Sequence, residues 1–283
     1  LPGGRAPMPG ELVRWPALAV TWERLLREAE AAATGREAQI DAARRVWSQG
    51  FVAEAVDRFL RDPLSTVDGR RDAGLLTGQD MAQWSATWED PVSVPWQGVE
   101  VHKTGPWGQG PVLPMLLKLM DRAGLADADP LGPDWVHLIA EGMKLVLADR
   151  DAWFADPEHE DVPLSALLSD AYADARAGLI GAEASHDLRP GAPEGRDPGP
   201  ARAALMERAG DGPGGLGAGE PTFADLPAVE GDTCHLSVID RHGTLVSATP
   251  SGGWLQSSPA IPGLGFSLTT RGQMFWLDER LPG

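Results

Sequence analysis

Two short runs of residues rich in hydroxyl side chains flank a tight turn near the end of the sequence. Thr233 opens the first run, Thr249 and Ser251 close the second, and the turn lies at residues 240–243. Alternating apolar residues on both sides of the turn predict a β-hairpin. In that hairpin Thr233 lies roughly opposite residues 249–251, so two or three hydroxyl groups converge at one end.

A cluster of hydroxyl groups has a catalytic and a structural interpretation. A Thr or Ser hydroxyl becomes the nucleophile of acyl transfer when a base lies within hydrogen-bond reach. Thr and Ser are also ordinary strand residues. His235 shares the face of Thr233, where it could line a site or simply pack in the strand. Cys234, the single cysteine of the chain, points to the opposite face, and we expect it to be buried rather than reactive.

The residues around the turn resemble the gamma-glutamyltranspeptidase family, whose small subunit opens with Thr in the pattern T-x-H-x-S-V-x-D-x-x-G. This chain matches the pattern at Thr233, His235, Ser237, Val238, Asp240 and Gly243. Three upstream stretches resemble large-subunit motifs of the family in the same order. They are Gly74-Leu75-Leu76-Thr77 with Asp80-Met81, Val99-Glu100-Val101-His102 with the Gly/Pro loop to Gly110, and His137 to Lys144 with Ala148-Asp149-Arg150. The resemblance covers most of the chain from about residue 40 to its end.

The resemblance implies an α/β protein with the four-layer α/β/β/α fold of N-terminal-nucleophile hydrolases, present here in part. The precursor of such an enzyme cuts its own chain, here between Asp232 and Thr233. Residues 1–232 would then be the C-terminal part of a large subunit. Residues 233–283 would be the N-terminal part of a small subunit made from the same precursor.

Cleavage before Thr233 would also supply the catalytic base. The α-amine that it frees has a reference pKa of about 7.7 to 8.0, so the amine can take the hydroxyl proton near neutral pH. Thr233 would attack a γ-glutamyl amide such as that of glutathione, and water or an acceptor amine would resolve the acyl-enzyme. Thr249, Ser251 or both would orient the nucleophile. This chemistry needs no metal and no organic cofactor.

One stretch departs from the family pattern. The transpeptidases carry N-N-x-M-D-D-F, whose carboxylates hold the glutamyl α-amine, where this chain has residues 269–278 and no acidic pair. A buried ammonium without a carboxylate partner is costly, which leaves a non-glutamyl amide, as in acylase-like relatives, as an alternative substrate. Arg271 could instead hold a substrate carboxylate. Gln273 is a further candidate contact, and Asp278 could supply a displaced negative charge.

The ends of the sequence suggest a piece of a longer protein, since it starts at Leu1 without Met and stops at Gly283. The family's arginine that grips the substrate carboxylate and its oxyanion hole lie outside this piece. Loss of one oxyanion donor costs about a hundred- to a thousandfold in rate, so we predict little or no turnover by these residues alone. A catalytically silent, truncated relative is the remaining alternative.

Composition argues against several classes of protein. The 283 residues carry 24 Lys and Arg against 41 Asp and Glu, a formal net charge of −17, which argues against nucleic acid or an anionic membrane surface as a partner. No apolar run of about 18 residues is present to span a bilayer. We expect a soluble protein, with the cytoplasm slightly favoured over the periplasm or secretion. One cysteine is too few for an internal disulfide.

We expect helices from the first 185 residues to cover one face of a sheet and the hairpin to lie within that sheet. Apolar spacing predicts helices over 21–61, with breaks at Gly35 and Gly50, over 112–123 and over 134–154. Alternation between 92 and 101 predicts a strand pair. Residues 75–88 predict a turn and a short helix, with Thr77 as its N-cap.

Two further stretches are candidates, one for a metal site and one for a flexible linker. His137 and Glu141 lie four residues apart on one predicted helix, but no third metal ligand is visible, so we expect a surface pair rather than a metal site. Residues 187–231 contain 17 Gly or Pro among 45, which predicts a flexible linker that would let the two chain ends part after cleavage.

Overall fold

The computed structural model describes residues 5, 8–65, 70–210, 235–250, 259–269 and 275–282. Six of the candidate site residues named above therefore lie outside the described residues: Asp232, Thr233, Cys234, Ser251, Arg271 and Gln273. The chain forms two compact units, one of residues 1–86 with 231–272 and the other of residues 87–230 with 273–283. Each unit thus joins a long upstream stretch to a short downstream one.

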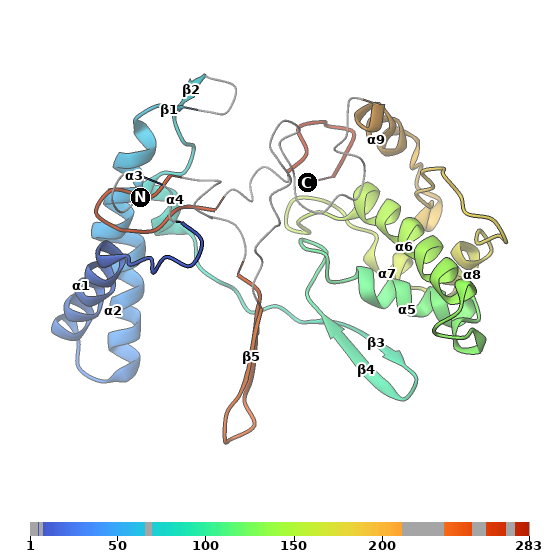
Figure 1. Ribbon diagram of the computed structural model, residues 1–283, viewed down its shortest axis with the longest axis horizontal. Coiled ribbons are helices and arrows are strands. Elements are labelled where there is room, and N and C mark those ends of the chain that lie inside the picture. Colours follow the sequence, from blue (N-terminus) through green and yellow to red (C-terminus); the bar gives the residue numbers. More distant parts are fainter. Residues whose placement is uncertain are drawn as a thin grey trace. The chain divides into compact units, whose positions relative to one another are not determined.

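The first unit begins with three successive helices, drawn in blue in Figure 1: α1 (Pro16–Ala32), α2 (Arg36–Gln49) and α3 (Phe51–Arg61). They confirm the predicted helical stretch and its breaks at Gly35 and Gly50. Gly35 has a φ of 89°, a conformation that favours glycine. Helix α1 starts five residues earlier than predicted because Pro16 occupies its first turn, where a missing N–H carries no penalty.

Short elements follow α3 in the same unit. β1 (Leu64–Ser65) and β2 (Arg71–Asp72) form an antiparallel pair, and α4 (Gly78–Gln83) comes next. Thr77 caps α4 as predicted: its hydroxyl accepts the N–H of Asp80, and the Asp80 carboxylate accepts the N–H of Thr77. This reciprocal capping box satisfies two backbone donors that the helix leaves unpaired.

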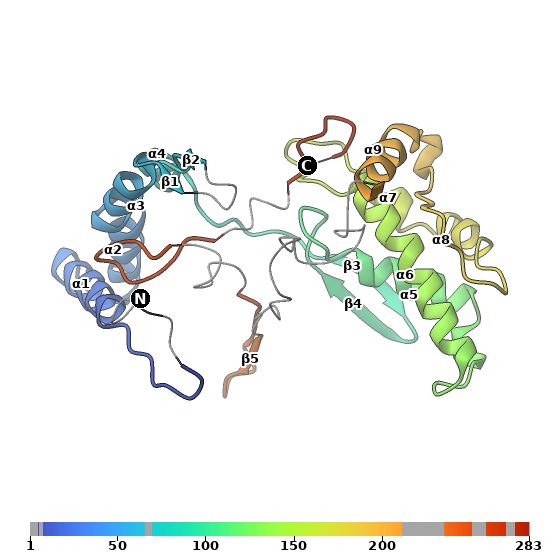
Figure 2. The same cartoon turned by 45° about the horizontal axis from the view of Figure 1, so that its top comes forward.

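The downstream segment 259–269 packs on the helices of the first unit and crosses them in red in Figure 2. Ile261 and Leu264 are buried against Val52 and Val56 of α3. The hydroxyl of Thr21 donates a buried hydrogen bond of 3.0 Å to the carbonyl of Leu264. Residues more than 200 positions apart therefore share this core.

An aromatic stack and a close backbone approach complete the contact. Trp47 stacks on Trp22 and on Phe266, with ring centroids 5.8 and 5.5 Å apart. Gly265 has a φ of 75°, and a Cβ there would overlap the backbone of Ala17 and Leu18. Only glycine fits this position without a shift of α1.

The predicted hairpin is present as β5 (Leu236–Ile239) and β6 (Leu245–Ala248), paired antiparallel. Its turn lies at residues 240–243, as predicted. Side chains on both strands are exposed, and the described strands of the chain form three separate two-stranded sheets. The four layers of the expected fold are thus only partly built by the described residues.

The second unit begins with β3 (Val92–Trp96) and β4 (Val99–Lys103), which confirm the predicted strand pair. Helices α5 (Val112–Arg122), α6 (Pro133–Trp153), α7 (Leu164–Leu167) and α8 (Asp170–Ala177) follow. The first two lie within one residue of the predicted bounds. Their core is one apolar cluster of buried residues: Met115, Leu119, Met120, Leu145, Val146, Phe154 and Leu167.

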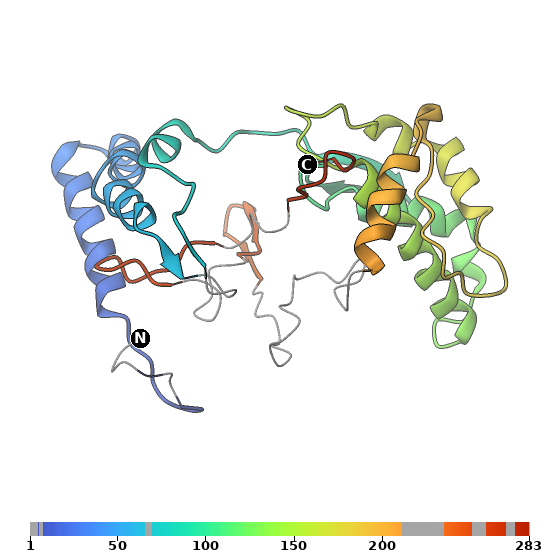
Figure 3. The same cartoon turned by 90° about the horizontal axis from the view of Figure 1, so that it is seen from above.

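Helix α9 (Gly199–Gly210), orange in Figure 3, contradicts part of the predicted linker. Ala201, Ala204 and Leu205 are buried on α6 and the chain end, so residues 187–210 belong to the packed unit. The prediction was wrong there because the Gly and Pro content was averaged over 45 residues. That average hid an Ala-rich run of residues 201–206, which strongly favours a helix.

No helix among the described stretches of the chain is both long and apolar enough to cross a membrane.

Candidate functional site

The turn of the β5–β6 hairpin is held by Asp240. Its carboxylate accepts the backbone N–H groups of Thr244 at 2.9 Å and His242 at 2.8 Å. These two hydrogen bonds hold the pKa of Asp240 below its usual range. Gly243 follows with a φ of 84°, which other residues adopt only at a cost. Asp and Gly at these positions of the motif are therefore required by the turn.

The turn sets the register of the two strands. Ser237 pairs with Ser247. Two residues further from the turn on each strand, His235 therefore lies opposite Thr249. The sequence alone left open which of Thr249 and Ser251 faces Thr233, and because Thr233 and Ser251 lie outside the described residues this choice stays open.

His235 joins two hydroxyl groups on one face of the hairpin. Its Nδ1 lies 2.7 Å from the Oγ1 of Thr249, and its Nε2 lies 2.9 Å from the Oγ of Ser237. A neutral imidazole donates from one nitrogen and accepts at the other, and each hydroxyl can take the complementary role. These three side chains form the imidazole–hydroxyl cluster, and the predicted convergence of hydroxyl groups on Thr233 stays a prediction.

Asp278 is engaged by a neighbouring arginine. Its carboxylate accepts the backbone N–H of Arg280 at 3.0 Å and two guanidinium N–H groups at 2.9 and 2.6 Å. Arg280 thereby lowers the pKa of Asp278 to about 2. The same guanidinium also makes two hydrogen bonds to Glu207 of α9. This arrangement favours a structural role for Asp278 over the displaced substrate contact expected from the sequence.

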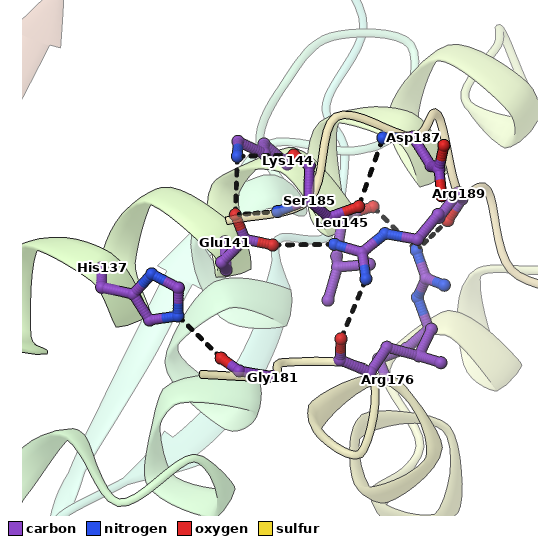
Figure 4. Close-up of polar contacts among 10 residues, drawn as sticks. His137, Glu141, Lys144, Leu145, Arg176, Gly181, Ser185, Asp187 and Arg189 are labelled. Atoms are coloured by element: carbon purple, nitrogen blue, oxygen red, sulfur yellow. Dashed lines mark hydrogen bonds and ion pairs between the residues drawn. The ribbon is translucent and has the colours of Figure 1, made fainter. Parts of the chain in front are cut away.

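Glu141 is a buried carboxylate on α6, with 1% of its surface exposed. Figure 4 shows it accepting Lys144 Nζ at 2.6 Å, the N–H of Ser185 at 3.1 Å and Arg189 Nη2 at 2.8 Å. Burial by itself raises the pKa of Glu141, but these three partners together bring it below the ordinary value. The expected surface pair with His137 is therefore wrong.

His137 instead faces the chain that follows α8, with Nε2 2.8 Å from the carbonyl of Gly181 (Figure 4). It shares no ligand with Glu141. Across the residues that the structure describes, no three His, Cys, Asp or Glu side chains gather as metal ligands do.

A second buried carboxylate, Asp149, lies two turns further along α6. It accepts the Nε of Arg176 at 3.0 Å and the N–H of Gly191 at 2.7 Å. Burial raises the pKa of Asp149 to about 6 despite the charge of Arg176. Glu141 and Asp149 together bind the segment 181–191 to α6. Sequence reasoning missed this role, although both acidic residues lie among apolar residues of α6 and that position was a signal for it.

Comparison with known proteins gives a family match along nearly the whole chain. The model of the family described as gamma-glutamyltranspeptidase matches residues 1–281. The glutathione hydrolase proenzyme of Pseudomonas aeruginosa is 28% identical over 204 residues, which cover 70% of this chain and 30% of that protein. The acylase ACY 1 proenzyme of a Pseudomonas species is 28% identical over 196 residues, covering 69% and 29%.

Solved structures also match nearly the whole chain. The structure of LmbA2991HD is 49% identical, with a TM-score of 0.79, and the match covers all of this chain and 45% of that one. The cephalosporin acylase from Bacillus halodurans is 24% identical with a TM-score of 0.65, covering 98% and 40%. This chain therefore spans less than half the length of each of these four proteins.

Proposed function

The chain belongs to the gamma-glutamyltranspeptidase family, and we propose that it is part of a self-processing amide hydrolase or transferase with Thr233 as its nucleophile. Its fold is that of N-terminal-nucleophile hydrolases, present in part, as the similarity to the cephalosporin acylase shows. The observation that carries the proposal is the β5–β6 hairpin. Its turn is held by the matched residues Asp240 and Gly243, and the matched residues His235 and Ser237 lie on one face of it, which supports the motif match.

The protein first matures by hydrolysis of the peptide bond between Asp232 and Thr233, in which water leaves a carboxyl group on Asp232 and an α-amine on Thr233. The freed α-amine of Thr233 removes the proton of its own hydroxyl, and the oxygen attacks the carbonyl carbon of an amide. The C–N bond of the substrate breaks, the departing amine takes the proton, and an ester to Thr233 remains. Water or a second amine then takes the acyl group and returns the hydroxyl to Thr233.

The imidazole–hydroxyl cluster would position the nucleophile in this scheme. Thr249, Ser251 or both would orient the hydroxyl of Thr233. Hydrogen bonds between His235 and the hydroxyl groups of Thr249 and Ser237 orient these side chains. We assign His235 and Thr249 as positioning residues, because the described contacts join them to each other.

Two substrate classes fit the family. A γ-glutamyl amide such as glutathione is the first candidate, and the glutathione hydrolase proenzyme supports it. An amide without an α-amine is the second, and the acylase proenzyme supports that class. The second candidate is favoured by one observation: the carboxylate of Asp278, the single acidic residue among 269–278, is engaged by Arg280.

A matched pair of substrates tests both the nucleophile and the substrate class. γ-Glutamyl anilide and glutaryl anilide differ only in the α-ammonium group, and both would be assayed with the protein expressed from the complete coding sequence. Removing one partner of a buried ion pair costs about 3 to 5 kcal/mol, so a carboxylate that holds the ammonium predicts at least about a hundredfold preference for the glutamyl compound. Comparable values of kcat/KM would establish the acylase class.

Thr233→Ala is the control for the nucleophile in this assay. We expect it to abolish turnover of both anilides. Retained turnover of either anilide by this variant would contradict the proposed nucleophile. A correctly folded protein that turns over neither anilide would favour the catalytically silent relative.

A further inference from the structure

A cavity of about 230 Å³ lies within the second unit, between the tip of the β3–β4 hairpin, helix α5 and the first turns of α6. Trp96 of the hairpin and Trp135 of α6 line it, and both are half-buried. Leu116, Met120 and Ile139 also line it and pack in the apolar core of the unit. Concave sites that are mostly apolar and carry a few polar groups are where proteins bind small molecules.

Asp121 of α5 brings a carboxylate to this cavity. Its Oδ1 accepts the indole N–H of Trp96 at 3.1 Å and the side-chain amide of Gln97 at 3.3 Å. No other polar contact joins the Asp121 side chain to the described residues, so its Oδ2 accepts no hydrogen bond from them. The basic side chains of α5, Lys118 and Arg122, form ion pairs with α8 instead. Two donors therefore orient the carboxylate, and no cation of the described residues pairs with it.

The backbone at Gln97 is strained in a way that serves this contact. Gln97 and Gly98 form a two-residue turn, with φ of 45° and 82°, between the paired residues Trp96 and Val99. Turns of this type need a positive φ at both positions and favour Asn or Gly at the first. Gln97 adopts that conformation only at a cost, and its side chain reaches Asp121. Strain of this kind is kept at ligand sites, so the turn is a second observation that points to a ligand.

We propose that the cavity binds a small organic amine, with its apolar body beside Trp96 and Trp135 and its protonated amino group on Asp121. An ammonium group is attracted both to a carboxylate and to the face of an indole ring. Among the described residues that line the cavity, Asp121 carries the only charge. It would repel an anionic ligand, and a neutral ligand would cover the carboxylate without pairing it. The lining residues all lie between positions 96 and 139, so the proposal stands whether or not the chain is cut before Thr233.

Calorimetric titration of the protein expressed from the complete coding sequence tests the site with three matched probes. These are 2-phenylethylamine, 2-phenylethanol and 3-phenylpropionate, which share a phenylethyl body and differ in charge. We expect the amine to bind about tenfold more tightly than the alcohol, through its ion pair and its contact with the indole rings, and the anion to bind more weakly than either. Equal affinities for the amine and the alcohol would overturn the proposal. So would the absence of amine binding, because another part of the full protein would then cover the cavity.

Substitution of Asp121 tests where the amine binds. Asp121→Asn should remove the preference for the amine over the alcohol. Asp127→Asn is the matched control, since it removes the same charge from an exposed residue that does not line the cavity, and it should keep the preference. An unchanged amine affinity in Asp121→Asn would refute the assignment.

Two further variants separate binding from structure and from the proposed reaction. Glycine adopts the turn conformation freely, so Gln97→Gly should be at least as stable as the parent in denaturant titrations. It should still bind the amine severalfold more weakly, because Asp121 loses a donor that orients it, and an unchanged affinity would contradict the role of Gln97. Thr233→Ala should bind the amine as the parent does. Loss of binding in that variant would place the amine at the proposed nucleophile and overturn the inference.

Discussion

Glu141→Gln is the substitution that most sharply tests the buried contacts of α6. The parent carboxylate accepts hydrogen bonds from two cationic side chains and from the N–H of Ser185. Gln has nearly the same shape but carries no charge, and one of its two polar atoms is a donor. That donor must face Lys144 or Arg189, which are donors themselves.

The size of the effect follows from these contacts. Hydrogen bonds to charged groups contribute about 1.5 to 3 kcal/mol each. Lys144 is 42% exposed and bonds also to the carbonyl of Ser185, so it can turn partly to solvent and reduce the loss. Arg189, at 21% exposed, has less room to do so. We expect a loss of about 2 kcal/mol, which corresponds to about thirtyfold faster opening of the segment 181–191.

Hydrogen exchange at the N–H of Ser185 measures this opening directly, because that group donates to Glu141. Glu183→Gln is the control, since it makes the same chemical change on an exposed residue of the same segment. Exchange at Ser185 should be about thirtyfold faster in Glu141→Gln and unchanged in the control. Equal rates in the two variants would refute the role assigned to Glu141.

Three further predictions concern pH, backbone conformation and helix capping. The folded state raises the pKa of Asp149 to about 6, so the folded protein binds this proton more tightly than the unfolded chain does. The free energy of unfolding of the parent, relative to that of Asp149→Asn, should therefore fall as the pH rises from about 4 to 6. Denaturant titrations that show a constant or rising difference between the two proteins across that range would contradict this. Gly265→Ala should lower the free energy of unfolding by more than the roughly 1 to 2 kcal/mol expected for a left-handed residue. Gly263→Ala, at a φ of 84° with open space around it, should show only that cost. Equal denaturation midpoints for the two variants would argue against the close approach of Gly265 to Leu18. Thr77→Ala should cost about 1 kcal/mol through loss of the capping box of α4, while Thr87→Ala, an exposed position outside any helix, should leave the denaturation midpoint unchanged.

Local patterns in the sequence predicted the elements whose structure depends on local interactions. The spacing of apolar residues identified α5 and α6 to within one residue, and the cap at Thr77 and the breaks at Gly35 and Gly50 were confirmed. Asp240 and Gly243 marked the hairpin turn for the same reason, because their contacts lie within five residues.

Contacts between distant residues could not be predicted in this way. Glu141 looked like a surface residue, since its partners Ser185 and Arg189 are 44 and 48 residues away. Leu281 and α9 meet across more than 70 residues, and no pattern near either one indicates the other. The contact between His235 and Thr249 depends on strand register, which the turn determines but which a list of hydroxyl residues does not.

The mass of the subunits made from the complete coding sequence tests the central claim most directly. The account predicts a cut between Asp232 and Thr233, which leaves Thr233 as the first residue of the small subunit, and predicts that Thr233→Ala abolishes the cut. A correctly folded parent protein that remains one intact chain would contradict the account, and Thr233 would then be an ordinary strand residue.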